Sequence, residues 1–337
     1  MMEVKALLKL IHNEWIKYFN RLSTYIMLGM IVGLFLLMTF FIITFGSGVD
    51  MKKEYSDDWK QEVSADIKKM SADLETLDKK DENKFSQEDF SKIAALQQEI
   101  PRLQFYLDKN VKPPAINNVF DNLLSTTNII NFVIIMVTVI VSSMMSREHQ
   151  QGTIKLLLIR PASRAKIFFS KWLTSLLIAL TFTVFTYLIS GLVGLLTGKM
   201  NPSSKHAVLN MMEGKYHMEN FWPYFFQIFL NDLLYVIIFA TIAYVLSVLF
   251  KNTAISLGVT IGLLFFSGLI TSFIAGKTDL VKFIWPANWS LNQYMDYLGA
   301  PPIDDMTYWF SLVYNIIALI ITLGIGYIVF KKRDVAD

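Results

Sequence analysis

The sequence predicts an all-α membrane protein with six transmembrane helices, an N-terminal interfacial helix and an extracellular helical hairpin. Two observations predict this class. Of the 337 residues, 53% are hydrophobic and 18% are charged, whereas soluble domains average about 45–50% apolar and about 25% charged residues. In addition, six stretches each contain about 20 or more mostly apolar residues, the length that crosses a bilayer as a helix.

The first 23 residues predict an amphipathic helix that lies in the membrane interface. One side carries Leu7, Ile11, Trp15 and other apolar residues, and a basic stripe lies on another side. A basic stripe opposite large apolar side chains is typical of interfacial helices. The alternative is an ordinary leader of the first span. The stripe repeats every four residues, at Lys5, Lys9, Asn13, Lys17 and Arg21.

The six predicted spans follow the apolar runs. The first lies within residues 24–45, and its length and charged leader distinguish it from a signal peptide. The other five lie within residues 119–337, the fourth and fifth being separated only by a short polar turn. The predicted spans cover residues 24–44, 124–145, 172–196, 225–250, 254–274 and 309–330.

The loop charges predict the orientation. With the N-terminus inside, the cytoplasmic pieces hold fourteen Lys and Arg residues and the short outside loops hold five. Because Lys and Arg are enriched in short cytoplasmic loops, both termini are predicted to be cytoplasmic. The sequence therefore predicts a multi-pass protein of the cell membrane, namely the bacterial plasma membrane.

Residues 46–118 predict an extracellular domain between the first two spans. Residues 50–112 hold 27 of the chain's 59 charges. Two apolar stripes at helical spacing run from Trp59 to Leu77 and from Phe90 to Leu107, which indicates an antiparallel helical hairpin. Pro101 predicts a kink or break in the second helix. The stripes either bury each other or also pack against a partner.

The segment 146–171, between the second and third spans, is the most informative. Residues 154–159 are too apolar for a solvated loop and need burial against the membrane or a partner protein. Gly152 permits a turn and Thr153 is a fair N-cap for a short helix. Arg160, Pro161 and the residues that follow turn the chain back. These features predict a docking surface rimmed by positive charge.

This segment resembles permease subunits of the type-2 ABC exporters. The resemblance rests on Glu148, Gly152-Thr153, Pro161, Ser163-Arg164 and Lys171 in this order and spacing. The six spans, the interfacial helix and the C-terminal run from Phe330 to Val335 agree with it. The large outside loop is similar to that of the bacitracin-resistance, bacteriocin-immunity and sodium-export branches. The resemblance covers most of the chain except this outside loop.

The resemblance implies a cytoplasmic coupling helix in this segment that contacts an ATPase. Each residue assigned to it has an alternative role in capping or orienting the helix. The chain has no phosphate-binding loop of the G-x4-GK[ST] type, so ATP and Mg are expected in a partner ATPase in two copies, with no cofactor on this chain. A second permease, identical or related, is also implied. The ATPase-coupling residues are Arg147, Glu148, Gly152, Thr153, Arg160, Pro161, Ser163 and Arg164.

Polar and small residues within the spans are candidates for the translocation path or the dimer contact, because polarity there is costly. Their spacing places three of them on one face of the second span, and a Gly-x3-Gly pair in the fifth span permits close helix contact. The alternative is packing within one subunit. The residues are Asn131, Thr138, Ser142, Gly258 and Gly262. Residues 275–307 resemble the family's re-entrant element before the last span, the alternative being an aromatic anchor.

Other function classes are disfavoured. The chain has no cysteine and its four histidines are dispersed, so no metal site is expected. A net charge of +3 is too weak to indicate nucleic acid. The leading prediction is a non-enzymatic transport subunit that exports a peptide antibiotic, a lipid-linked compound or an ion. The alternative is an ATP-independent membrane transporter, or a receptor whose extracellular hairpin binds a partner.

Overall fold

The computed structural model describes residues 2–45, 55–79, 86–114, 119–153, 163–197, 205–210, 215–295 and 298–332. The chain divides into two compact units. Unit 1 comprises Met1–Ile31, Thr127–Thr186 and Gln227–Asp337, and unit 2 comprises Val32–Thr126 and Tyr187–Phe226. Three long helices, α2 (Leu22–Phe45), α9 (Arg164–Thr197) and α10 (Phe221–Phe250), contribute residues to both.

The predicted all-helical membrane class is confirmed. Six helical segments in the described parts of the chain are long and apolar enough to cross a membrane. The last five are longer than the predicted spans, because their helices continue past the apolar runs, whereas the first, with 20 residues, is not. The segments are Leu22–Phe41, Val119–Gln150, Arg164–Leu196, Phe221–Phe250, Thr253–Ala275 and Tyr308–Lys332.

Unit 1 contains most of the helical bundle. Its N-terminal helix α1 (Met2–Phe19) is separate from α2, with Asn20 and Arg21 in the turn between them. The second span is not one helix but a series: α5 (Val119–Ser125), the 3-10 turn η2 (Thr126–Ile129), α6 (Ile130–Val141) and α7 (Ser143–Gln150). This span is central, since 78% of its most apolar window is buried.

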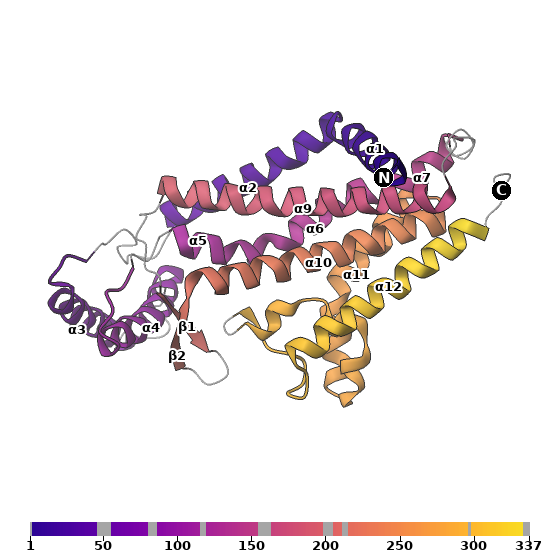
Figure 1. The fold of residues 1–337 in the computed structure, drawn as a ribbon. Helices are drawn as coiled ribbons and strands as arrows, with labels where there is room; N and C mark the ends of the chain where they lie inside the picture. Colours follow the sequence, from indigo (N-terminus) through magenta and orange to yellow (C-terminus); the bar gives the residue numbers. More distant parts are fainter. Residues whose placement is uncertain are drawn as a thin grey trace. The chain divides into compact units, whose positions relative to one another are not determined.

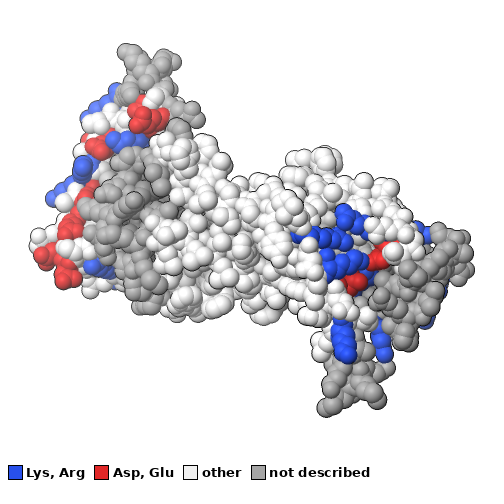
Figure 2. All heavy atoms as spheres, turned by 90° about the horizontal axis from the view of Figure 1, so that it is seen from above, with Lys and Arg blue, Asp and Glu red and all other residues white. Residues whose placement is uncertain are grey.

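The last two spans of unit 1 are peripheral. Only 11% of the apolar window is buried in α11 (Thr253–Ala275) and in α12 (Tyr308–Lys332). Large apolar side chains such as Leu269 and Ile320 are more than 60% exposed. Figure 2, drawn from the side of α1 and α2, shows that the middle part of that surface is also free of acidic and basic side chains. Surface of this kind is suited to contact with lipid rather than water.

The short loop between α10 and α11 is a helix cap. Lys251 adopts a left-handed conformation with φ 53°. The Asn252 side chain then accepts hydrogen bonds from the backbone N–H groups of Ala254 and Ile255. An N-cap of this type satisfies donors that the first turn of a helix leaves free.

The region predicted to be re-entrant consists of three 3-10 helices, η3 (Asp279–Phe283), η4 (Trp285–Asn288) and η5 (Leu291–Tyr294). They pack on α11 and α12. The Asn288 side chain joins the segment to α12, because its Oδ1 accepts a hydrogen bond from Ser311 at 2.6 Å. Trp285 donates to Asn315 at 2.9 Å.

Unit 2 contains α3 (Trp59–Asp78) and α4 (Gln87–Asp108), which pack against each other. The core between them is formed by Tyr55, Val63 and Leu103. The predicted break at Pro101 is wrong, because α4 continues through this residue. Packing of Leu96 and Leu103, both nearly fully buried, holds the helix together on either side of the proline. The polar turn predicted between the two helices lies largely outside the described residues.

Unit 2 also contains a small sheet that the sequence analysis missed. Strands β1 (Lys205–Asn210) and β2 (Lys215–Asn220) pair antiparallel, with Lys205 opposite Asn220. The backbone N–H of Ala207 donates to Tyr106 Oη at 3.1 Å, and Tyr216 donates to the Gln98 carbonyl at 3.0 Å. The hairpin is thereby attached to α4, beside which Figure 1 draws the two arrows.

Candidate functional site

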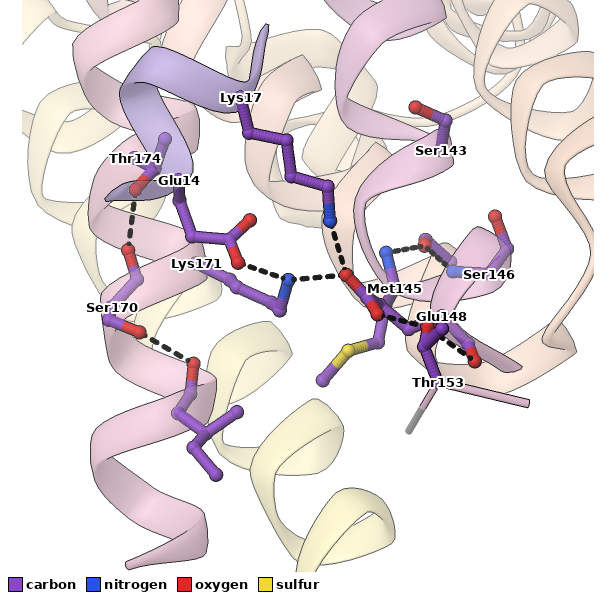
Figure 3. Close-up of polar contacts among 12 residues, drawn as sticks. Glu14, Lys17, Ser143, Met145, Ser146, Glu148, Thr153, Ser170, Lys171 and Thr174 are labelled. Carbon is purple, nitrogen blue, oxygen red and sulfur yellow. Dashed lines mark hydrogen bonds and ion pairs between the residues drawn. The ribbon is translucent and has the colours of Figure 1, made fainter. Parts of the chain in front are cut away.

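A cluster of four charged side chains, of which all but Lys17 are buried or half-buried, joins three helices of unit 1. Lys171 Nζ on α9 lies 2.9 Å from Glu14 Oε1 on α1 and 3.3 Å from Glu148 Oε1 on α7. Lys17, also on α1, donates to the same Glu148 oxygen. Figure 3 shows the four side chains converging from their three helices. We call Glu14, Lys17, Glu148 and Lys171 the ionic cluster.

The local sequence explains why these side chains meet. Glu14 and Lys17 are three residues apart on α1 and therefore share a face. Glu148 lies in the last turn of α7, and Lys171 lies in the second turn of α9. The contact between Lys171 and Glu148 shows that the end of α7 lies beside the early part of α9.

The cluster is balanced in charge and largely withdrawn from solvent. The side chains of Lys171 and Glu148 are 1% and 7% exposed, whereas Lys17 is 40% exposed. Burying an ion is costly unless it is paired and hydrogen-bonded. Glu14 Oε2 is buried and makes no hydrogen bond among the described residues. Two carboxylates and two ammonium groups therefore offset each other's burial, and Glu14 is the least satisfied member.

The buried side chain of Tyr18 helps to fix the position of the cluster on α1. Tyr18 follows Lys17 and is 1% exposed. Burial, reinforced by the neighbouring carboxylate of Glu14, raises the pKa of the Tyr18 phenol well above its ordinary range. The Thr24 hydroxyl donates to the Tyr18 carbonyl at 2.7 Å, which fixes the turn from α1 into α2. The position of Glu14 and Lys17 is thus fixed by packing as well as by charge.

The structure places the predicted coupling residues in different environments. Gly152 has φ +66°, a conformation that favours glycine, and makes the turn after α7. The Thr153 hydroxyl donates to Glu148 Oε2. Glu148 faces inward. Arg147 is exposed, as is Ser163. Arg160, Pro161 and the predicted coupling helix lie outside the described residues.

Arg164 has a structural contact that the sequence did not predict. It donates from Nη1 to the Lys331 carbonyl at 2.9 Å, at the C-terminal end of α12. A cation at a helix C-terminus satisfies a free carbonyl and interacts favourably with the helix dipole. The residues that flank the segment 154–162 therefore contact α1 and α9 at Glu148 and α12 at Arg164.

The candidate path residues of the second span differ in exposure. Asn131 lies exposed at the start of α6, whereas Thr138 and Ser142 are 0% exposed. On α11, a side chain added at Gly258 or Gly262 would meet nothing within 4 Å, so this face is open in the single chain. None of these observations tests a role in transport or in dimer contact.

A second polar cluster lies near the start of α10. Asp232 is 1% exposed and accepts hydrogen bonds at Oδ1 from Thr127 (2.9 Å) and from Asn292 (2.7 Å). Asn231 donates to Asn292 Oδ1 at 3.0 Å, and Tyr308 donates to Asn231 at 2.9 Å. This network connects η2, α10, η5 and α12. The partners of Asp232 and Asn231 come from segments that are distant in the sequence.

Comparisons with known proteins place the chain in a family. Residues 90–336 match the family described as "Protein of unknown function (DUF2705)". The chain belongs to the DUF2705 family. The match begins within α4 and includes the last five spans, Glu148 and Lys171. Glu14 and Lys17 of the ionic cluster precede it.

Two Bacillus subtilis (strain 168) proteins are similar to this DUF2705 chain. The "Uncharacterized protein YhcI" is 31% identical over 335 residues, which cover 98% of this chain and 100% of YhcI. The "Uncharacterized membrane protein YdbK" is 27% identical over 221 residues, which cover 64% of this chain and 83% of YdbK. The membrane character of YdbK agrees with the six apolar helices of this DUF2705 member.

Proposed function

We propose that this chain is the membrane-spanning subunit of a type-2 ABC exporter. It moves a peptide antibiotic, a lipid-linked compound or an ion out of the cytoplasm or the membrane, and a separate subunit, present in two copies, hydrolyses ATP. A second permease subunit completes the assembly. Both termini are cytoplasmic, the α3–α4 hairpin is extracellular, and residues 146–171 are the coupling segment.

The single observation that carries the proposal is the ionic cluster. It joins α7, which precedes the coupling segment, to α9, which follows it, and joins both to α1. In this proposal, a movement of residues 154–162 that a partner causes is transmitted to α7 and α9, and through the ionic cluster to α1. Arg164 extends this connection to the end of α12. A transport subunit needs such a rigid connection between its docking segment and its spans.

The cluster acts as a positioning device in this proposal. Salt bridges withdrawn from solvent are costly to break by removal of one partner, so α1, α7 and α9 are expected to move together. The exposed residues of the segment, Arg147 and Ser163, remain available to a partner. The buried residue Glu148 transmits the movement. We therefore assign docking to the exposed residues and transmission to the ionic cluster.

The proposal is tested by purification with candidate cytoplasmic ATP-binding-cassette ATPases, beginning with any that a neighbouring gene encodes. The tagged chain is expected to retain one of these ATPases and to stimulate its activity in nanodiscs. Arg160→Glu, in the docking segment, is expected to abolish binding of the ATPase. Glu148→Gln is expected to retain binding but to weaken the stimulation. Lys9→Met, an exposed cation on α1, serves as the matched control.

The opposite results are equally informative. An intact chain that neither binds the ATPase nor responds to ATP overturns the proposal and favours an ATP-independent transporter. The substrate is identified separately, by comparing a deletion strain with its parent on a panel of peptide antibiotics and salts. If the deletion strain is sensitive to a compound, and the wild-type chain restores resistance but Arg160→Glu does not, that compound is assigned to this chain.

A further inference from the structure

The second span is divided at a single residue. Helix α6 ends at Val141, helix α7 begins at Ser143, and Ser142 lies between them. The first four N–H groups of any helix have no acceptor within that helix. In α7 these groups belong to residues 142–145, of which the N–H of Ser142 donates to the Thr138 carbonyl of α6 at 2.9 Å. Since this division is buried in the centre of unit 1, its free donors need partners from elsewhere.

Ser247 of α10 supplies the acceptor. Its hydroxyl oxygen lies 3.0 Å from the backbone nitrogen of Met145 and 3.0 Å from that of Ser146, and each N–H donates to it. Ser247 is 0% exposed. By contrast, Ser142, which occupies the N-cap position, makes no capping bond with its side chain. Ser142 itself has helical backbone angles (φ −57°, ψ −24°), and the first turn of α7 receives its additional acceptor from another helix.

Two hydroxyls at the same place have no partner. Thr138 Oγ1 and Ser142 Oγ are fully buried and make no hydrogen bond among the described residues. They are four residues apart and so share one face. The other buried hydroxyls nearby donate to a carbonyl three or four residues earlier in the chain. Examples are those of Ser143, Ser146, Ser170, Thr174, Thr183, Ser256 and Thr260.

The unpartnered face is placed beside α11. The Ser146 and Thr253 hydroxyls lie 2.6 Å apart, so the first residue of α11 lies beside the first turn of α7. Because α11 also contacts α6, the two helices run antiparallel from this point. This register brings Ser142 to the level of Ser256 and Thr138 to the level of Thr260, both buried on α11. The two hydroxyls without a partner are thus placed between α6 and α11, at the levels of the polar residues Ser256 and Thr260.

We propose that the second span is hinged at Ser142 and that a buried water binds at the hinge, held by the hydroxyls of Thr138 and Ser142. A buried water forms about three hydrogen bonds to polar groups that otherwise lack partners. Ser247 is the positioning residue that keeps α7 aligned. Helix α7, with Glu148 in its last turn, swings about Ser142 while α6 remains intact. This inference does not require the proposed ATPase.

The first test removes the two hydroxyls from the full chain in nanodiscs. In Thr138→Val with Ser142→Ala, the melting temperature is expected to fall and amide exchange at residues 142–148 to accelerate, because the water and its hydrogen bonds are lost. If the site is dry, the same change removes two unsatisfied groups and raises the melting temperature, which overturns the inference. Thr183→Val, whose hydroxyl bonds within its own helix, is the control.

The second test addresses Ser247 by hydrogen exchange and mass spectrometry. Ser247→Ala is expected to make the amides of Met145 and Ser146 exchange about fivefold faster, as for the loss of one helix cap. Ser170→Ala, a buried serine on α9, is expected to leave these amides unchanged. Equal exchange in both variants would show that α7 needs no cap from α10, and the hinge as described would be rejected. The replacements are no larger than the native side chains, so they fit the existing packing.

Discussion

Lys171 Nζ and Glu14 Oε1 lie 2.9 Å apart and connect the N-terminal helix to the third span. The same ammonium contacts Glu148, so one lysine that is 1% exposed serves two carboxylates. A lysine so deeply buried persists only when its charge is offset. The position of α1 is consequently coupled to that of α7 through a single side chain.

Lys171→Met is expected to destabilise the chain strongly. The change leaves Glu14 and Glu148 facing each other with only Lys17 to offset them. Removal of one partner from a buried pair typically costs about 3–5 kcal/mol, and the expected result is a large fall in melting temperature in nanodiscs. Lys9→Met, on the exposed side of α1, should leave the temperature unchanged. Equal effects of the two substitutions would contradict the assigned role of the cluster.

Arg164→Gln is expected to loosen the end of α12. The guanidinium donates to the Lys331 carbonyl, and loss of a cation at a helix C-terminus typically costs about 0.3–1 kcal/mol. Amide exchange at residues 328–332 should therefore accelerate. Arg164→Lys retains the charge and should give a smaller change. Arg147→Gln, which changes an exposed arginine, is the control. If residues 328–332 also exchange faster in Arg147→Gln, the effect does not come from the contact between Arg164 and the Lys331 carbonyl.

Asn292→Ala is expected to release the 3-10 segment from α10. Asn292 donates to Asp232 and accepts from Asn231, so its removal leaves buried polar groups with fewer partners. Each such group costs about 1–3 kcal/mol. Amide exchange across residues 285–294 should increase markedly. The control Asn131→Ala removes an exposed amide and should have little effect. If residues 285–294 stay protected from exchange in Asn292→Ala, the network does not hold this segment on α10.

The stability of the α3–α4 pair is expected to depend on pH through Glu99. Burial raises the pKa of this carboxyl above its ordinary value of 4.5, although Arg102 at 2.8 Å opposes the shift. A raised pKa in the folded state stabilises the fold fully below the ordinary value. That contribution is lost as the pH rises through the raised value. The pair should therefore become less stable as the pH increases from about 4.5.

The chain's lack of cysteine makes this measurement direct. A fluorescent thiol probe on Glu75→Cys, an exposed position of α3, reports unfolding of the α3–α4 pair within the full chain. Glu99→Gln should flatten the pH dependence. A slope that persists in Glu99→Gln would assign the effect to another group.

The sequence predicted the six spans because their apolar runs are continuous and long. Their ends were less predictable, because helices such as α9 continue past the apolar run into polar residues. The division of the second span at Ser142 escaped detection for the same reason: residues on both sides are compatible with one helix. Only the contact from Ser247 distinguishes the two pieces.

The β-hairpin was missed because its stability comes from another segment. Strands of six residues with mixed polar composition give a weak pattern, and their attachment to Tyr106 and Gln98 is invisible in the local sequence. The ionic cluster was predicted only in part. Glu148 and Lys171 belong to the recognised spacing, but nothing in the sequence pairs Glu14 with Lys171.

The attachment of β1 and β2 to α4 has a consequence for chimeras with relatives such as YhcI. Two stretches of chain that are separated by two membrane crossings form one module. A chimera that exchanges residues 46–118 alone would set a foreign α4 against the native strands and remove the partners of Ala207 and Tyr216. Exchanges between relatives should therefore transfer residues 46–118 and 198–220 together, as a matched pair.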